Sequence, residues 1–107
     1  MSMKKNKVSP SSTTREQADW LRSYTKDKDI SSGKAVREGL KLLQAGMENG
    51  GVECYLPSEP LLDRIPMVLL PDEQAEFLNG LAPTWGSKAS VIRTALNLLE
   101  DQETKGK

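Results

Sequence analysis

A stretch that occurs twice constrains the fold of this chain more than any other feature of its sequence. Residues 16–21 read Glu-Gln-Ala-Asp-Trp-Leu, and residues 73–78 read Glu-Gln-Ala-Glu-Phe-Leu, at an offset of 57. Each copy is followed by a turn and a second segment with helical apolar spacing, residues 34–43 and 90–99, now at an offset of 56. Agreement in the same order along the chain indicates two copies of one small unit.

The length of the chain suits a pair of units that stabilise each other. A unit of about 45 residues buries too little apolar surface to be stable alone, so the second copy can act as its partner. We expect a first unit over residues 1–50, a linker over 51–63 in which nothing repeats, and a second unit over 64–107. Extended at about 3.3 Å per residue, the linker reaches roughly 40 Å, enough to bring the second unit back beside the first.

Apolar spacing and turn residues predict a weak strand and two helices in the first unit. A short strand near Val8 is confined to a sheet edge or a bulge, because Pro10 lacks the N–H group that a ladder needs. Residues 13–16 have the spacing of a capping box, which predicts that a helix begins there. A hydroxyl at Ser31 or Ser32 begins the next helix, and residues 49–51, Asn-Gly-Gly, end it.

The second unit repeats this order with a clearer strand. Residues 64–70 are short, β-branched or aliphatic, and predict a strand. Pro71 opens a helix that we expect to end near residues 79–80, Asn-Gly, and Ser87 caps the last helix. The predicted fold class is therefore mainly α with a short antiparallel β-ribbon.

Composition excludes several classes of protein. No apolar run approaches the roughly 20 residues that cross a bilayer, and no apolar segment follows the basic N-terminus as it would in a signal peptide. Cys54 is the only cysteine, which rules out an internal disulfide and fits a cytoplasmic protein. Without histidine, one thiol makes no zinc site, and no catalytic constellation stands out, so we expect no enzyme, metal or cofactor.

Charge is unevenly distributed along a chain whose net charge is zero. Residues 1–50 hold ten Lys/Arg against six acids, and residues 51–107 hold five Lys/Arg against nine acids. Such asymmetry suggests that the two halves face different partners, although an ordinary solvated surface explains it equally well.

The repeated unit resembles the ribbon-helix-helix (MetJ/Arc-like) superfamily, and looks closest to ParD-type antitoxins. The residues that carry the resemblance are 16–22 with 35–43 in the first copy, and 70–74 with 87–96 in the second. As a tandem repeat in one chain, it implies an intramolecular pseudo-dimer, with non-identical halves reading non-identical half-sites. The sequence leaves open whether the units pair within one chain or between chains, and so whether the protein is a monomeric pseudo-dimer or a homodimer.

The resemblance also implies a mode of DNA binding. One strand from each unit pairs into a ribbon that enters the major groove, and the N-terminus of each second helix holds a backbone phosphate. Carried over to this chain, the phosphate-binding residues are Ser31, Ser32 and Gly33, with Ser87 and Lys88 in the second unit. Helix capping alone also explains these serines.

A lysine-rich arm precedes the first strand. Lys4, Lys5 and Lys7 are either a disordered arm or an arm that contacts DNA phosphates. Arg37 and Arg93 hold the same place in the two copies, and each either pairs with a nearby acid or makes a contact across the two units.

Strand alternation predicts which side chains face outward. If Leu70 faces the core, Val68 and Pro66 join it, and Ile65, Met67 and Leu69 face outward. This apolar surface either binds a protein partner or is covered by the chain itself. The same alternation in the first unit places Ser12, Pro10 and Val8 outward, of which only Ser12 is a plausible base reader. A bulge at Pro10 would instead turn Lys5 and Lys7 outward.

Two functions remain in view. The first is a small DNA-binding transcriptional regulator, one form of which is an antitoxin that represses its own operon. The second is a protein-interaction module, neutralising a toxin or acting as an adaptor, that keeps the fold but binds little or no DNA. The first rests on the resemblance and the basic first half, and the second rests on the acidic second half and the apolar strand.

Overall fold

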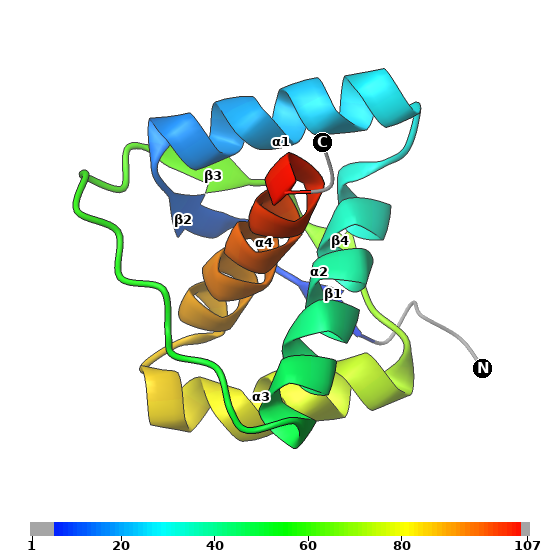
Figure 1. The fold of residues 1–107 in the computed structure, drawn as a ribbon, viewed down its shortest axis with the longest axis vertical. Helices are drawn as coiled ribbons and strands as arrows, with labels where there is room; N and C mark the ends of the chain where they lie inside the picture. Colours follow the sequence, from blue (N-terminus) through cyan, green and yellow to red (C-terminus); the bar gives the residue numbers. More distant parts are fainter. Residues whose placement is uncertain (1–5, 106–107) are drawn as a thin grey trace.

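The computed structural model describes residues 6–105, and over that range the chain is mainly helical with short antiparallel strand pairs (Figure 1). The elements follow in the order β1 (Lys7–Val8), β2 (Ser11–Thr13), α1 (Arg15–Lys28), α2 (Ser32–Glu48), β3 (Asp63–Ile65), β4 (Val68–Leu69), α3 (Asp72–Trp85) and α4 (Lys88–Lys105). The predicted fold class, mainly α with a short antiparallel ribbon, is confirmed.

The strands pair between the two halves of the chain in one continuous register. β1 pairs with β4, with Lys7 opposite Leu69, and β2 pairs with β3, with Ser12 opposite Arg64. Two residues on each side, 9–10 and 66–67, separate the pairs without shifting the register. Each interruption contains a proline, whose missing N–H removes a ladder bond.

These interruptions change which side chains face the core. The buried strand positions are Val8, Ser11 and Thr13 on one side and Ile65, Val68 and Leu70 on the other. Across each interruption the neighbouring buried positions, 8 and 11 or 65 and 68, are three residues apart, whereas simple alternation requires two. The expectation that Val8 and Ile65 face outward is therefore wrong, since they are 7% and 1% exposed. Pro66, expected in the core, is exposed.

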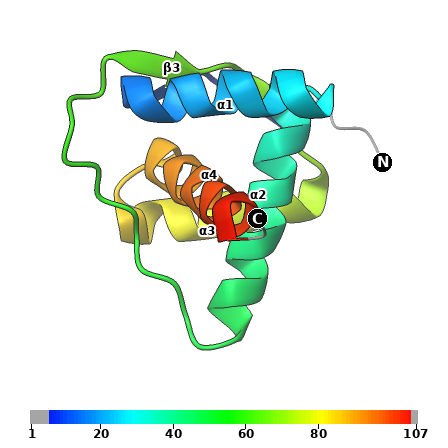
Figure 2. The same ribbon diagram turned by 45° about the horizontal axis from the view of Figure 1, so that its top comes forward.

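The core lies mainly between α2 and α4, with α1 and α3 on opposite sides of this pair (Figures 1 and 2). The two central helices supply most of the large buried side chains: Val36, Leu40, Leu43, Val91, Ile92, Leu96 and Leu99. Gly39 lies so close to Ala95 that an added Cβ would come within 2.6 Å of the Ala95 carbonyl oxygen. At this point the backbone of α2 therefore packs directly against the backbone and the side chain of Ala95 in α4.

Arginines of the central helices bind the strands of the opposite half. Arg37 Nη1 donates to the carbonyl oxygen of Leu69 at 3.0 Å, and Arg93 Nη1 donates to the carbonyl oxygen of Ser12 at 2.7 Å. Of the two alternatives for these arginines, the structure therefore shows the contact between the two halves. The repeat relates Arg37 to Arg93 and Ser12 to Leu69, so the two bonds are equivalent in the two halves.

Glutamines of the flanking helices make a second matched pair of bonds. Gln17 Nε2 donates to the carbonyl oxygen of Arg93 at 3.0 Å, and Gln74 Nε2 donates to that of Arg37 at 2.9 Å. Both glutamines are buried. The four bonds connect the halves at corresponding places, so the repeat extends from the sequence to the contacts.

Two predicted helix ends differ from the structure. α1 is capped by Thr14, whose Oγ1 accepts from Gln17 N, while Thr13 is a buried strand residue. α3 does not end near residues 79–80 but continues through Pro83 to Trp85, where Gly86 takes a positive φ of 96°. Leu81, Ala82 and Trp85 pack on the core, and this burial outweighs the local preference of Asn-Gly to end a helix.

Candidate nucleic-acid interface

The outward side of the strand pairs carries a cation at each end. We call it the ribbon face and define it by the exposed or partly exposed residues Lys7, Ser9, Pro10, Ser12, Arg64, Pro66, Met67 and Leu69. Lys7 and Arg64 occupy corresponding places in the two halves, at an offset of 57. Five register positions separate them along the ribbon, about 16 Å at roughly 3.3 Å per residue.

Sequence reasoning placed Lys7 in an arm and missed Arg64 altogether. Lys7 is part of β1 and is exposed opposite Leu69, as a parity change at Pro10 requires. The same change of strand parity at Pro66 explains why Arg64 is exposed. The signal was present in the sequence, because each half carries a proline within two or three residues of the cation and the two cations share one repeat position.

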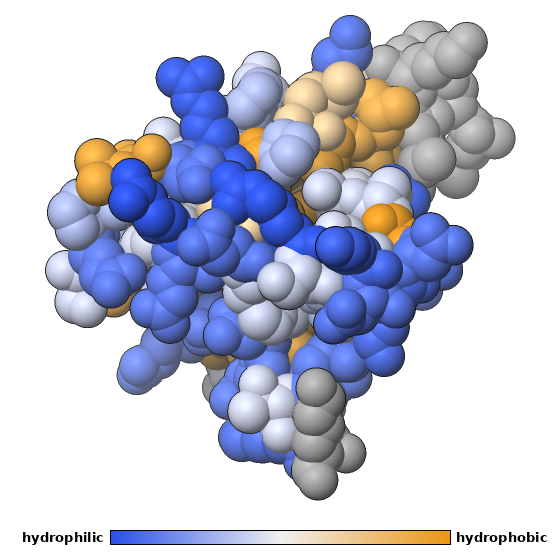
Figure 3. Space-filling model, turned by 90° about the horizontal axis from the view of Figure 1, so that it is seen from above, coloured by the Kyte–Doolittle hydropathy of each residue, from blue (hydrophilic) through white to orange (hydrophobic). Residues whose placement is uncertain are grey.

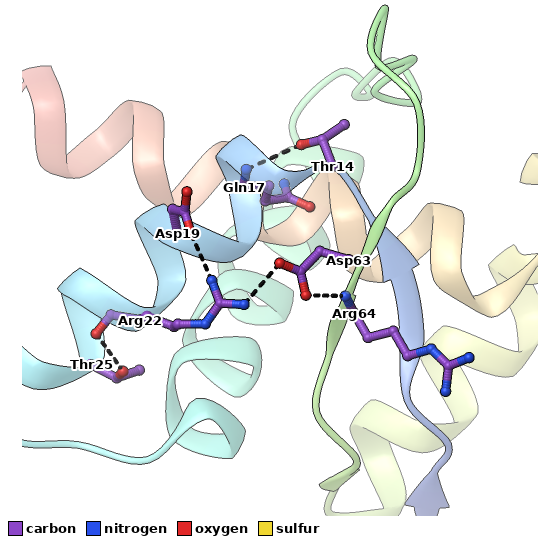
Figure 4. A network of polar contacts seen from close by, with 7 residues as sticks. All are labelled: Thr14, Gln17, Asp19, Arg22, Thr25, Asp63 and Arg64. Carbon is purple, nitrogen blue, oxygen red and sulfur yellow. Dashed lines mark hydrogen bonds and ion pairs between the residues drawn. The ribbon is translucent and has the colours of Figure 1, made fainter.

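The acid next to Arg64 is engaged elsewhere. Asp63 Oδ2 accepts from Arg22 Nη2 at 2.8 Å, and its other oxygen accepts from the backbone N–H of Arg64 at 2.8 Å (Figure 4). These bonds lower the pKa of Asp63, with the bond from Arg22 as the main cause. Figure 4 shows the Arg64 side chain pointing away from Asp63. Within residues 6–105, Lys7 and Arg64 make no ion pair.

The N-terminus of α4 lies beside the first strand. A surface depression of about 270 Å³ is lined by residues 7–12 together with Lys88 and Ala89. Ser87 Oγ accepts from Ser90 N at 3.1 Å, so Ser87 is the cap of this helix. Lys88 is exposed at the edge of the same depression. The structure thus brings Ser12, Lys7 and Lys88 to one side of the molecule.

The N-terminus of α2 lies near β4, to which Arg37 links it. Ser31 caps the helix through its Oγ, which accepts from Lys34 N at 3.1 Å. A Cβ at Gly33 would lie 3.1 Å from Nη1 of Arg37, the same atom that donates to Leu69. Ser32 and Gly33 are partly exposed in the first turn. The capping role predicted for Ser31 and Ser87 is confirmed, and the contact with phosphate stays a prediction.

The predicted partner-binding residues divide between the surface and the core. Met67 is 44% exposed and Leu69 is partly exposed, whereas Ile65 is buried and does not reach the ribbon face. The other large exposed apolar side chains are in the linker, at Leu56, Leu61 and Leu62. Figure 3, seen from the α1 side, shows a mainly hydrophilic surface with separate apolar patches. Lys4 and Lys5 lie outside the described residues.

Residues 6–105 were compared with the requirements of a metal site and of a membrane-spanning helix. No group of three or more His, Cys, Asp or Glu side chains there is placed to hold a metal ion. None of the helices in this range has the length and apolar character needed to cross a membrane. In comparisons with known proteins, no family model, no curated protein and no solved structure matches the chain.

Proposed function

We propose that the chain is a small DNA-binding transcriptional regulator of ribbon-helix-helix architecture, folded as an intramolecular pseudo-dimer. The continuous strand register and the four matched bonds between the halves support the pseudo-dimer. One chain then presents both strands of a DNA-reading ribbon. An antitoxin that represses its own operon is one form of such a regulator.

The ribbon face enters the major groove and reads base edges at its two ends. The observation that carries this proposal is the exposure of Lys7 and Arg64 at opposite ends of that face, without an ion pair among the described residues. Both side chains donate well to the O6 and N7 atoms of guanine. Ser12, opposite Arg64, adds a hydroxyl that donates or accepts.

The helix N-termini hold the backbone on either side of the groove. Free N–H groups in the first turns of α2 and α4 face phosphate oxygens, with Ser31, Ser32 and Gly33 at one end and Ser87 and Lys88 at the other. Such contacts fix the register of the ribbon without reading sequence. Lys4 and Lys5 extend the phosphate contacts in this proposal.

A protein-interaction module is the second candidate. The exposed Met67 in the middle of the ribbon face favours it, because an apolar side chain there gains little from contact with phosphate. On this alternative the ribbon face binds a protein partner, such as a toxin, and DNA binding is weak or absent.

Binding to random-sequence duplex DNA, followed by fluorescence anisotropy at low and physiological salt, separates the two candidates. The regulator requires binding that weakens steeply with salt. On a duplex that carries the preferred sequence, the variants Lys7→Ala and Arg64→Ala should each weaken binding about tenfold, since a good base contact contributes roughly 1–3 kcal/mol of discrimination. Lys26→Ala is the matched control, because Lys26 is exposed in the last turn of α1.

The opposite result has a clear meaning. If the wild-type chain does not bind even at low salt, the DNA-binding function is wrong. If Met67→Ala then abolishes capture of a purified partner while leaving the fold intact, the interaction module replaces it.

A further inference from the structure

The linker is bound to α4 on one side of the molecule. After α2 it runs past α4 (Figure 1), where the backbone N–H of Tyr55 donates to Thr94 Oγ1 at 2.8 Å. Tyr55 is partly buried, and this burial, followed by the nearby carboxylates of Glu16 and Glu100, raises its pKa. We call this place the linker cleft and define it by Thr94, which binds the backbone of Tyr55, and by the charged residues that act on Tyr55 from α1 and α4, namely Glu16, Arg93 and Glu100.

The other half of the molecule has an open cleft at the corresponding place. The repeat relates the four residues of the linker cleft, in the same order, to Glu73, Arg37, Glu38 and Gln44. All four line one cavity of about 470 Å³ between α2 and the start of α3. We call this cavity the open cleft. Its other lining residues are Lys34, Lys41, Pro71 and Gln74.

The two clefts share one backbone framework. Arg37 and Arg93 each donate to a strand carbonyl of the opposite half, and Gln74 and Gln17 each donate to the carbonyl of the arginine beside them. A surface that accepts an extended segment on one side therefore has a counterpart of similar construction on the other. The chain fills the first with its own linker and leaves the second open.

Charge is the main difference between the clefts, and it indicates what the open one accepts. The open cleft has Lys34, Arg37 and Lys41 against Glu38 and Glu73, an excess of one positive charge. The positions that correspond to Lys34 and Lys41 hold Ser90 and Asn97, so the linker cleft has Arg93 against Glu16 and Glu100. An acidic segment is thus favoured more strongly in the open cleft.

We propose that the open cleft docks an extended, acidic segment of a partner protein, with an aromatic side chain in the place that Tyr55 takes in the linker cleft. The linker itself shows the required chemistry: residues 51–63 contain three acids and no lysine or arginine. This interaction is separate from the ribbon face and does not depend on DNA binding.

A partner protein fits the open cleft better than the linker of a second copy. Each copy already holds its own Tyr55 against Thr94. The linker must also connect α2 to β3 within the chain. Reaching another molecule would first require that these contacts be released, which costs the free energy with which the linker binds within its own chain.

The test uses a fluorescein-labelled decapeptide with the sequence of residues 51–60, carrying Cys54→Ser to prevent oxidation, titrated with the full chain. We expect saturable binding that weakens at least tenfold when the peptide carries Tyr55→Ala. The double variant Lys34→Glu/Lys41→Glu of the protein should also weaken it at least tenfold. Both lysines are exposed, so the fold is preserved, and Lys26→Glu should leave binding unchanged.

Several results would overturn the proposal. The peptide would not bind, or the double variant would bind it as well as the wild-type chain. Amide chemical shifts that change around Thr94 rather than Glu38 would show that the peptide only exchanges with the linker. Sedimentation that shows a dimer, lost in the Tyr55→Ala variant of the full chain, would assign the open cleft to a second copy instead.

Discussion

Gly39 lies against Ala95 where α2 crosses α4, and the two residues hold the same position in the two halves of the repeat. A Cβ on Gly39 would lie 2.6 Å from the carbonyl oxygen of Ala95 and 3.3 Å from its Cβ. The crossing is therefore as close as the backbones allow. Leu40, Leu43 and Leu96 of the same two helices are fully buried, so the core offers little room for an added methyl group.

Gly39→Ala should lower the free energy of unfolding by about 1–3 kcal/mol, the usual cost of overpacking a dense core, because the helices must separate to admit the methyl group. Urea unfolding of the purified variant measures the change. Gly80→Ala is the matched control, since Gly80 lies inside α3 with nothing within 4 Å of an added Cβ. It should raise stability by about 0.5–1 kcal/mol. A neutral Gly39→Ala would contradict the close crossing.

The two buried glutamines should differ in their contribution to stability. Gln17 both donates to the Arg93 carbonyl and accepts from Thr13 Oγ1. Leu70 takes the place of Thr13 in the second half, and Gln74 Oε1 has no hydrogen-bond partner within the described residues.

Replacing Gln17 with Ala should therefore cost more than replacing Gln74 with Ala, by about 1 kcal/mol, the net contribution of one buried hydrogen bond. Parallel urea titrations of the two variants give this difference directly. Equal losses would mean that the bond from Thr13 contributes nothing measurable.

Glu100 should make the protein more stable in mild acid. Burial, together with the charges of Glu16 and Asp101, raises the pKa of Glu100 above its ordinary value of 4.5. Between 4.5 and the raised pKa the folded state binds more protons than the unfolded state, so stability increases as the pH falls through this window.

Glu100→Gln should therefore melt at a higher temperature than the wild-type chain at pH 7, and the two should converge as the pH approaches 4.5. Gln44, which holds the corresponding position, shows that the framework accepts a glutamine there. Melting curves at several pH values provide the measurement. Glu48→Gln, at an exposed position near the end of α2, should leave the melting temperature at pH 7 unchanged.

Asp63 should have the opposite effect on stability: its contribution to the free energy of unfolding should be lost in stronger acid. Its bond from Arg22, and then the backbone N–H of Arg64, lowers its pKa below the ordinary value of 3.8. The carboxylate therefore stabilises the fold above pH 3.8, and this contribution disappears as the pH falls through the lowered pKa. Asp63→Asn should lose less stability than the wild-type chain between pH 4 and pH 2, as circular dichroism melts would record. The same acid dependence in both proteins would argue against this pair.

The order of the elements could be predicted from the sequence, because capping serines, helix-ending glycines and apolar spacing are local signals. The repeat showed that the same order occurs twice. Ser31 and Ser87 cap their helices as predicted, and the linker brings the second half beside the first. The end of α3 was not predictable in this way. Its last turn is held by contacts of Ala82 and Trp85 with residues distant in sequence.

The candidate site was predicted only in part, since strand parity depends on what happens at two prolines. Pro10 and Pro66 interrupt the ladder, and each interruption moves the following residues to the other side of the ribbon. Simple alternation therefore assigned Ile65 to the surface and overlooked Arg64. The open cleft could not be anticipated from sequence either, because it forms only where α2 packs beside the start of α3, and its relation to the place of Tyr55 appears only in the folded chain.

Under the proposed function, Lys7 and Arg64 should each determine one end of the recognised DNA sequence. They lie about 16 Å apart along the ribbon, which corresponds to about five base pairs at roughly 3.4 Å per step. The ends also differ, since Lys7 faces Leu69 across the ribbon and Arg64 faces Ser12. The preferred sequence should therefore be non-palindromic, with a guanine near each end.

Selection of bound duplexes from a random library, repeated with Lys7→Ala and Arg64→Ala, provides the measurement. Each variant should lose the preference for guanine at its own end and keep the other, because a base contact affects only the base that it reads, whereas a phosphate contact weakens all sequences alike. A palindromic preference, or a uniform loss of affinity in both variants, would show that the two cations bind only the backbone. The DNA-binding function would then stand without the base readout assigned to the ribbon face.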